Sequence, residues 1–220
     1  MVGVKVRLIV RRWKQGWTRP RYDVFDVEAD PEESVLDLIE RVSLSTDRTL
    51  VFEHACHHGA CGACGMIING VERLACVTKV GEAARKGLLL VEPLRGFEVI
   101  SDLAVDKSRM FSKYPAETQT LEPVAASLEK LYDCVECGVC YSACPIANTY
   151  GEYLGPSVLA LAYHRALSDG VVPGSVAGSG GVWACHAAFD CSEKCPVGFK
   201  PGEKIMKLRR LLLGGRVKVS

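Results

Sequence analysis

The chain has 220 residues, and its 27 Lys and Arg against 26 Asp and Glu give a formal net charge of +1 at pH 7. This balance argues against nucleic acid as a partner, because nucleic-acid binding usually needs a strongly basic face. An apolar fraction of 48% supplies a buried core, and the length suits two domains of about 100 residues each.

Features of membrane-spanning or exported chains are absent from the sequence. No apolar run approaches the roughly 18 residues that a membrane-spanning helix needs. The start, MVGVKVRLIV, lacks the charged, apolar and small-residue regions of a signal peptide. Eleven cysteines, an odd number, also argue against a disulfide framework. We therefore expect a chain of the reducing cytosol.

The first half reads as strands around one helix. Period-two alternation predicts a strand over 4–10, and a second is predicted over 22–27. Asp30 is expected to cap a helix with Pro31 in its first position. The apolar stripe of that helix is Val35, Leu36, Leu38, Ile39 and Val42. Further strands are predicted over 66–69, 74–77 and 88–91. This is an α+β pattern, and it ends near residue 105.

The cysteines of this half lie in or soon after one glycine-rich loop, at Cys56, Cys61, Cys64 and Cys76. Their C-x4-C-x2-C spacing with a later fourth member is the plant-ferredoxin pattern for a [2Fe–2S] centre. Zinc is the main rival, but zinc sites pair C-x2-C with a second C-x2-C or a histidine pair. His57 and His58 are interpreted as loop or surface residues, with tuning of the cluster as the alternative.

The second half begins with a polar connector over 106–122 and then becomes helical. Helices are predicted around 124–131, 156–167 and 202–213. Pro145 and Pro196 each follow the last cysteine of a run and are expected to open the next helix. We interpret 106–220 as an all-α ferredoxin-type domain with two related halves.

Two cysteine runs carry the chemistry of this half. The first reads C-x2-C-x2-C-x3-C-P and consists of Cys134, Cys137, Cys140 and Cys144. The second has the same spacing with Ala188 replacing its second cysteine, and consists of Cys185, Cys191 and Cys195. In two-cluster ferredoxins the last cysteine of each run ligates the other cluster. The exchange predicts a [4Fe–4S] cluster on the first three thiols with Cys195.

The other cluster then has three thiolates: Cys144, Cys185 and Cys191. A fourth iron would lack a protein ligand beside Ala188, so the set favours [3Fe–4S]. The alternative is a labile [4Fe–4S] cluster completed by water or a partner. Cys140 and Cys144 serve different clusters only four residues apart, so these clusters must be close neighbours.

The sequence resembles the iron–sulfur subunit of the succinate dehydrogenase/fumarate reductase family (respiratory complex II) over nearly its whole length. The resemblance rests on the Leu50-Val51-Phe52 approach to Cys56, CHHGACGACGMIING with LAC, VEPLRGFEVISDLAVD, and both Cys-Pro runs in order. It implies a β-grasp plant-type [2Fe–2S] ferredoxin domain over 1–105. An all-α two-cluster ferredoxin domain would follow over 106–220.

The resemblance also implies a role and partners. Electrons would pass between FAD on a flavoprotein subunit and quinone at a membrane-anchor subunit, in the tricarboxylic acid cycle or in reverse. No catalytic residue is expected on this chain, whose place would be the cytoplasmic side of the cell membrane, held there through its partners. Pro145, Ile146 and His186 hold the quinone-side positions of the family, although a structural role fits His186 equally. Trp183 is expected to pack over a cluster, and Thr149 replaces a tryptophan common in the family.

Two alternatives remain at this point. One is an iron–sulfur adaptor for another flavin-dependent or thiol-linked reductase or dehydrogenase. The other is a zinc-stabilised interaction module, which would have no redox activity. Arg and Lys residues crowd both ends of the chain, and they fit either solvated surfaces or docking and membrane-facing surfaces.

Overall fold

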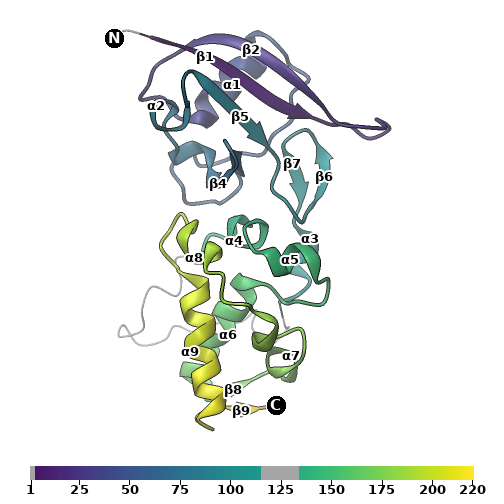
Figure 1. Cartoon of the computed structure of the whole chain (residues 1–220), viewed down its shortest axis with the longest axis vertical. Helices are drawn as coiled ribbons and strands as arrows, with labels where there is room; N and C mark the ends of the chain where they lie inside the picture. Colours follow the sequence, from purple (N-terminus) through teal and green to yellow (C-terminus); the bar gives the residue numbers. More distant parts are fainter. Residues whose placement is uncertain (1–2, 115–133) are drawn as a thin grey trace. The chain divides into compact units, whose positions relative to one another are not determined.

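The computed structural model describes residues 3–114 and 134–220, and the chain forms two compact units, Met1–Asp106 and Lys107–Ser220 (Figure 1). The division expected from the sequence lies one residue earlier. The helix predicted over 124–131 and the later part of the 106–122 connector lie outside the described residues.

The first unit is built on a five-stranded sheet with the order β2-β1-β5-β3-β4. Its strands are β1 (Val4–Arg12), β2 (Arg21–Ala29), β3 (Gly65–Ile68), β4 (Val71–Leu74) and β5 (Leu88–Glu92). β1 and β5 run parallel, whereas the other three neighbouring pairs are antiparallel. Buried and exposed residues alternate along β1, as a sheet with one covered face requires.

The helix α1 (Val35–Ser45) buries the five predicted stripe residues, and Figure 1 shows it behind the sheet. The expected cap was wrong: Ser34, rather than Asp30, is the N-cap. The Ser34 hydroxyl accepts the N–H of Asp37 at 3.0 Å, and the Asp37 carboxylate accepts the Ser34 N–H at 3.4 Å. This reciprocal capping box satisfies two N–H groups at once, so it fixes the start of the helix.

The strand predicted over 74–77 was also wrong. Asn69 and Gly70 both have positive φ, at 47° and 80°. Two such residues form the tight hairpin turn that brings β4 back beside β3 from residue 71. The strand therefore ends at Leu74, and residues Ala75–Val77 form a short 3-10 helix, η1, followed by α2 (Val80–Ala83).

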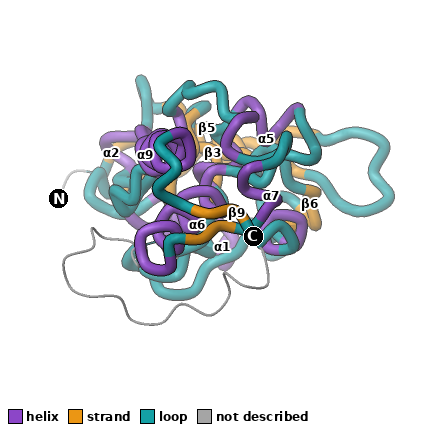
Figure 2. Tube along the Cα trace, turned by 90° about the horizontal axis from the view of Figure 1, so that it is seen from below, coloured by secondary structure: helices purple, strands orange, loops and turns teal. Residues whose placement is uncertain are grey.

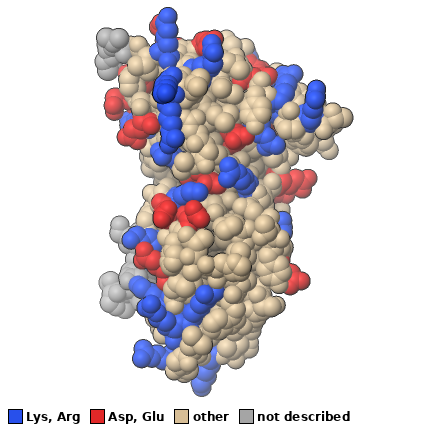
Figure 3. Space-filling model, viewed as in Figure 1, with Lys and Arg blue, Asp and Glu red and all other residues tan. Residues whose placement is uncertain are grey.

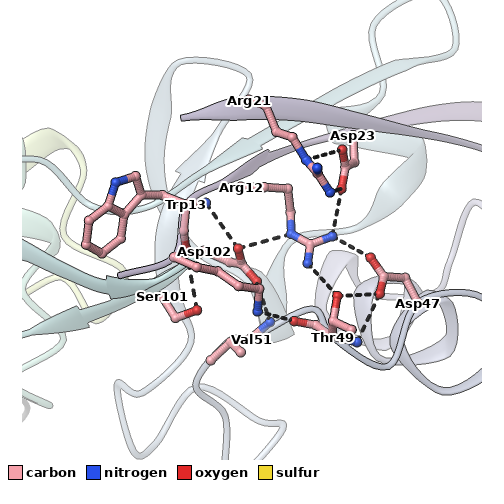
Figure 4. A network of polar contacts seen from close by, with 10 residues as sticks. Arg12, Trp13, Arg21, Asp23, Asp47, Thr49, Val51, Ser101 and Asp102 are labelled. Carbon is pink, nitrogen blue, oxygen red and sulfur yellow. Dashed lines mark hydrogen bonds and ion pairs between the residues drawn. The ribbon is translucent and has the colours of Figure 1, made fainter. Parts of the chain in front are cut away.

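A small hairpin that the sequence did not predict closes the first unit. It consists of β6 (Glu98–Ser101) and β7 (Ala104–Asp106), with Asp102 in its turn. The fully buried Asp102 carboxylate lies 3.1 Å from Nε of the buried Arg12 at the end of β1. Figure 4 shows the polar network that extends from this pair to Asp23 and Asp47.

The second unit centres on two helices, α6 (Pro156–Asp169) and α9 (Pro201–Leu213), which pack side by side (Figures 1 and 2). Both were predicted to within two residues at each end. The shorter helices are α3 (Ser108–Phe111), α4 (Val139–Ser142), α5 (Pro145–Thr149), α7 (Gly174–Ala177), α8 (Asp190–Glu193) and the 3-10 helix η3 (Val182–Ala184).

Two expectations for this unit need correction. It is not wholly α-helical, because β8 (Val171–Val172) and β9 (Lys218–Val219) pair as short parallel strands where the chain end returns beside α6. Pro145 opens α5 as expected, but Pro196 lies in a turn and the next helix begins at Pro201. Within residues 3–114 and 134–220, no helix combines the length and the apolar character that crossing a bilayer requires.

Candidate metal centres

The first centre is the loop between α1 and β3. Sγ of Cys56 accepts backbone N–H groups from Ala60 at 3.2 Å and from Cys61 at 3.3 Å. A third N–H, from His58, reaches the same sulfur at 3.5 Å. Gly59 and Gly62 have φ values of 80° and 70°, which turn successive N–H groups in one direction. The loop is therefore arranged to stabilise negative charge on sulfur.

The other two thiols of this centre, Cys64 and Cys76, are buried where the loop meets the sheet. Cys64 lies directly before β3 and Cys76 in η1, and the Cys64 carbonyl accepts the Ala75 N–H at 3.0 Å. The His58 N–H lowers the pKa of Cys56 to about 6, together with further hydrogen bonds from Cys61 and Ala60. Burial and the neighbouring Cys64 raise the pKa of Cys76 to about 12.

A cavity in the second unit collects Cys134, Cys137, Cys140 and Cys195. The first three come from the run that leads into α4, whereas Cys195 comes from the second run. Met110, Ser157 and Phe199 complete much of its wall. The four thiols that the ligand exchange assigns to one cluster therefore line one cavity.

A second cavity in this unit is lined by Cys144, Cys185 and Cys191, with Ala188 in its wall. The quinone-side candidates Pro145, Ile146 and His186 line this same cavity. Four thiols line the cavity that contains Cys134, whereas three line this one. The two cavities therefore differ in the number of thiolate ligands that they can offer.

The donor atoms of both cavities suit a soft metal rather than free thiols. Burial raises the pKa of Cys137 to about 11 and that of Cys191 to about 12. It also raises the pKa of Cys134, Cys140 and Cys144. Such thiols ionise at neutral pH only beside a cation, and clustered iron supplies that positive charge. The residues fit iron–sulfur clusters because four thiols line one cavity and three line the other.

Backbone groups again point at sulfur in these cavities. The Phe199 N–H lies 3.3 Å from Sγ of Cys195, and the Ala187 N–H lies 3.4 Å from Sγ of Cys185. Arg209 of α9 donates to the carbonyl oxygens of Val182 and Cys185, which fixes the start of the second run.

Tyr153 was missed by the sequence reasoning. Its side chain is fully buried, lines the cavity of Cys144 and Cys185, and has a pKa raised by burial and by the charge of nearby thiolates. No motif marks this position. The tyrosine is recognisable only once the fold places it beside the cluster thiols.

Other sequence candidates lie at the surface. His57 and His58 are exposed, as expected. Trp183 was expected to pack over a cluster, but it lines neither thiol cavity and is 44% exposed. Its indole N–H donates to the Ala177 carbonyl, and Arg209 lies 5.8 Å from its ring centre. Thr149 donates its hydroxyl hydrogen to the Pro145 carbonyl at 2.9 Å, within α5.

Comparisons with known proteins agree with this division. Residues 7–112 match the family model of a 2Fe-2S iron-sulfur cluster binding domain, and residues 130–199 match that of a 4Fe-4S dicluster domain. The chain is 34% identical to the fumarate reductase iron-sulfur subunit of Mycobacterium tuberculosis, covering 86% of this chain and 85% of that protein. It is 29% identical to the succinate dehydrogenase iron-sulfur subunit of Paracoccus denitrificans, covering 94% and 88%.

Two solved structures share the fold. A chain of the Mycobacterium smegmatis Sdh1 complex in its apo form aligns with a TM-score of 0.77 and 23% identity, over 97% of this chain and 98% of that one. A hypothetical protein from Helicobacter pylori aligns with a TM-score of 0.60 and 15% identity, over 96% of this chain and 40% of that chain. At these identities the likeness concerns the fold.

Proposed function

The chain belongs to the iron–sulfur subunits of the succinate dehydrogenase and fumarate reductase family, and from this premise we propose its cluster ligands and its partners. Its role is electron transfer within an oxidoreductase complex. One relative is named as a fumarate reductase subunit and the other as a succinate dehydrogenase subunit, so their names cover both directions of the reaction. The proposed cluster types and ligands rest on the thiols and on the residues that line the two cavities.

In the first unit, we assign a [2Fe–2S] cluster to Cys56, Cys61, Cys64 and Cys76, on a β-grasp ferredoxin fold. The mixed five-stranded sheet with α1 behind it supports that fold. Three backbone N–H groups at Cys56 support the ligand role, because they offset the negative charge of a thiolate. The exposed Cys61 places one edge of the site at the surface, where a redox partner can approach.

In the second unit, we assign a [4Fe–4S] cluster to Cys134, Cys137, Cys140 and Cys195. The remaining thiols, Cys144, Cys185 and Cys191, would hold a [3Fe–4S] cluster. The crossed grouping of Cys144 and Cys195 is the observation that carries this assignment. Ala188 lines the three-thiol cavity where the second run would have a fourth cysteine, so a fourth iron would have no thiolate ligand there.

When bound, such clusters each accept and release one electron. The chain brings its two cavities together through neighbouring residues. Cys140 lines one cavity and Cys144 the other, and Cys195 and Cys191 repeat this division in the second run. Pro201 and Gly202 at the start of α9 likewise line different cavities. This shared wall supports direct electron transfer from one site to the next.

The proposed partners are a flavoprotein subunit with FAD and a membrane-anchor subunit with quinone. Pro145, Ile146 and His186 line the three-thiol cavity, which supports their placement on the quinone side. Figure 3 shows Lys and Arg side chains gathered along α9, and such a face suits either solvent or a docked partner. We place the chain at the cytoplasmic side of the cell membrane, attached through these subunits.

Cys64→Ala in the assembled complex tests the proposal. We expect loss of the paramagnetic resonance of the reduced [2Fe–2S] cluster, retention of the other two signals, and stalled quinone reduction by succinate. Ala63→Ser, in the same loop, is the matched control and should retain all three signals. Full turnover without the [2Fe–2S] signal would refute the electron path, and zinc in place of iron would refute the cluster assignment.

A second candidate is an adaptor subunit for a different flavin-dependent or thiol-linked reductase. Thr149 favours it, because a tryptophan common in the family is missing beside the proposed quinone side. The subunits that purify with the chain decide between the two. A flavoprotein with a quinone-binding anchor supports the first candidate, and a thiol-linked or soluble acceptor subunit supports the second.

A further inference from the structure

Three side chains outside the cysteine sets converge beside the first loop. Glu40 lies on α1, and His54 and His57 lie in the segment that leads into and through Cys56. One ligand atom from each lies within 4.8 Å of the others. Nδ1 of His54 lies 3.0 Å from Nε2 of His57, which in turn lies 4.0 Å from Oε2 of Glu40.

A fourth residue orients the central histidine. Nδ1 of His57 lies 3.4 Å from Oδ1 of Asp37, so this nitrogen is the one placed to carry the proton. Asp37 is itself held by Ser34, whose hydroxyl donates to its other oxygen at 2.7 Å. The lone pair of Nε2 then points to His54 and Glu40. A carboxylate behind a histidine in this manner is the usual support of a metal ligand.

The backbone and the neighbouring ring hold the two histidines in place. His57 has a φ of 60°, in the left-handed region that few residues other than glycine adopt. The ring of His54 stacks on Phe52, with centroids 5.1 Å apart and planes 22° apart. Strain and stacking of this kind are common where side chains are held for binding. Both rings therefore have contacts that orient them, although their residues are exposed.

We propose that Glu40, His54 and His57 form a binding site for a Zn²⁺ ion, with Asp37 as the positioning residue. Two imidazole nitrogens and one carboxylate oxygen are a common zinc ligand set, with the fourth position open to water. The nitrogens disfavour Mg²⁺ and Ca²⁺, which prefer oxygen ligands. Such an ion would tie the segment that enters the cysteine loop to α1. Its ligands are side chains other than the cysteines, although His57 directly follows Cys56, so the proposal does not depend on the proposed electron path.

Equilibrium dialysis of the cluster-loaded full chain against ZnCl₂ tests the site. We expect one zinc per chain, and His54→Gln and Glu40→Gln should each weaken binding roughly tenfold or more. Asp37→Asn should weaken it by roughly 10- to 100-fold through His57, as removing such an orienting carboxylate commonly does. Glu53→Gln and His58→Gln are matched controls, because both residues are exposed nearby and outside the proposed ligand set. MgCl₂ should not compete.

X-ray absorption at the zinc edge identifies the ligands directly. We expect nitrogen and oxygen near 2.0–2.1 Å with imidazole scattering, and unchanged visible absorption of the clusters. Sulfur near 2.3 Å, or loss of cluster absorption as zinc binds, would mean that zinc occupies the cysteines and would overturn the proposal. Unchanged binding in both His54→Gln and Glu40→Gln would overturn it as well.

Discussion

Asp102→Asn should weaken the first unit, because this buried carboxylate joins three segments. It accepts the backbone N–H of Trp13 at 3.1 Å and that of Val51 at 3.0 Å, and it lies 3.1 Å from Nε of Arg12 (Figure 4). Asparagine has nearly the same shape and tolerates the φ of 48° at this position. The substitution therefore removes the charge and one acceptor while it leaves the turn possible.

The size of the effect follows from what Arg12 retains. Breaking a buried ion pair commonly costs about 3–5 kcal/mol, since it leaves a charge without compensation. The Arg12 guanidinium keeps Asp23 at 2.9 Å and Asp47 at 2.5 Å, so the lower end applies. A loss of about 3 kcal/mol corresponds to roughly a hundredfold larger opening equilibrium of this network.

Hydrogen exchange of the cluster-loaded chain, followed by mass spectrometry, measures this opening. Peptides that contain the amides of Trp13 and Val51 should exchange about a hundredfold faster in the variant. Asp26→Asn is the matched control, because Asp26 pairs with Arg7 at 2.8 Å with side chains 70% and 56% exposed. It should leave both peptides nearly unchanged. Equal exchange in wild type and Asp102→Asn, or equal effects of both variants, would refute the reasoning.

The remaining predictions concern three further positions. Hydrogen bonds from Thr49 and Arg12 lower the pKa of Asp47 to about 2. Asp47→Asn should therefore lower the free energy of unfolding by about 1–2 kcal/mol near neutral pH, which is less than the whole pKa shift would give because the side chain is partly exposed. This pKa lies below the value of about 4 in the unfolded chain, so the contribution of Asp47 to stability is complete above about pH 4 and is lost as the pH falls towards 2. A difference in urea unfolding between wild type and variant that changed between about pH 5 and 7 would contradict this reasoning. Ala188→Cys should convert the three-thiol centre towards [4Fe–4S] and lower its reduction potential, since a fourth thiolate adds negative charge; an unaltered oxidised resonance spectrum would refute the crossed ligation. Gly155→Ala should lower the thermal stability of the second unit by about 2 kcal/mol or more, because φ is +99° and the new Cβ would lie 2.9 Å from the Tyr141 ring. Gly170→Ala, at φ +68° with open space around it, should cost clearly less.

Elements that carry a long periodic pattern could be predicted from the sequence. The strands β1 and β2 alternate over many residues, and α6 and α9 both begin at or beside a proline followed by an apolar face. In each case the local conformational preference and the burial of the apolar face favour the same element, so tertiary packing does not change it. Their ends were accordingly within a few residues of the prediction.

Short elements depended on particular contacts instead. The helix α1 starts after Ser34, where Ser34 and Asp37 form a capping box, and not after Asp30. Asp30 makes similar local hydrogen bonds, from its own N–H to Glu33 and from the Glu32 N–H to its carboxylate, but they close a turn that precedes the helix. The pair β8 and β9 consists of two residues each, far apart in the sequence, and forms only because the chain end returns beside α6. No local pattern contains that information.

The same distinction explains which parts of the site could be found in advance. The grouping of thiols could be predicted from the spacing of the two runs, and because only three residues separate Cys140 from Cys144, their two sites must be close neighbours. Spacing does not place Tyr153 or Glu40 in the same way, since each comes close to its site only when the fold brings a distant segment beside it. His57 lies between these cases: its position beside Cys56 was evident, but its partners Asp37 and Glu40 sit one helical turn apart on α1 and face the loop only after folding. Metal ligands that lie close in sequence can thus be predicted from spacing, whereas ligands that join a helix to a loop require the structure.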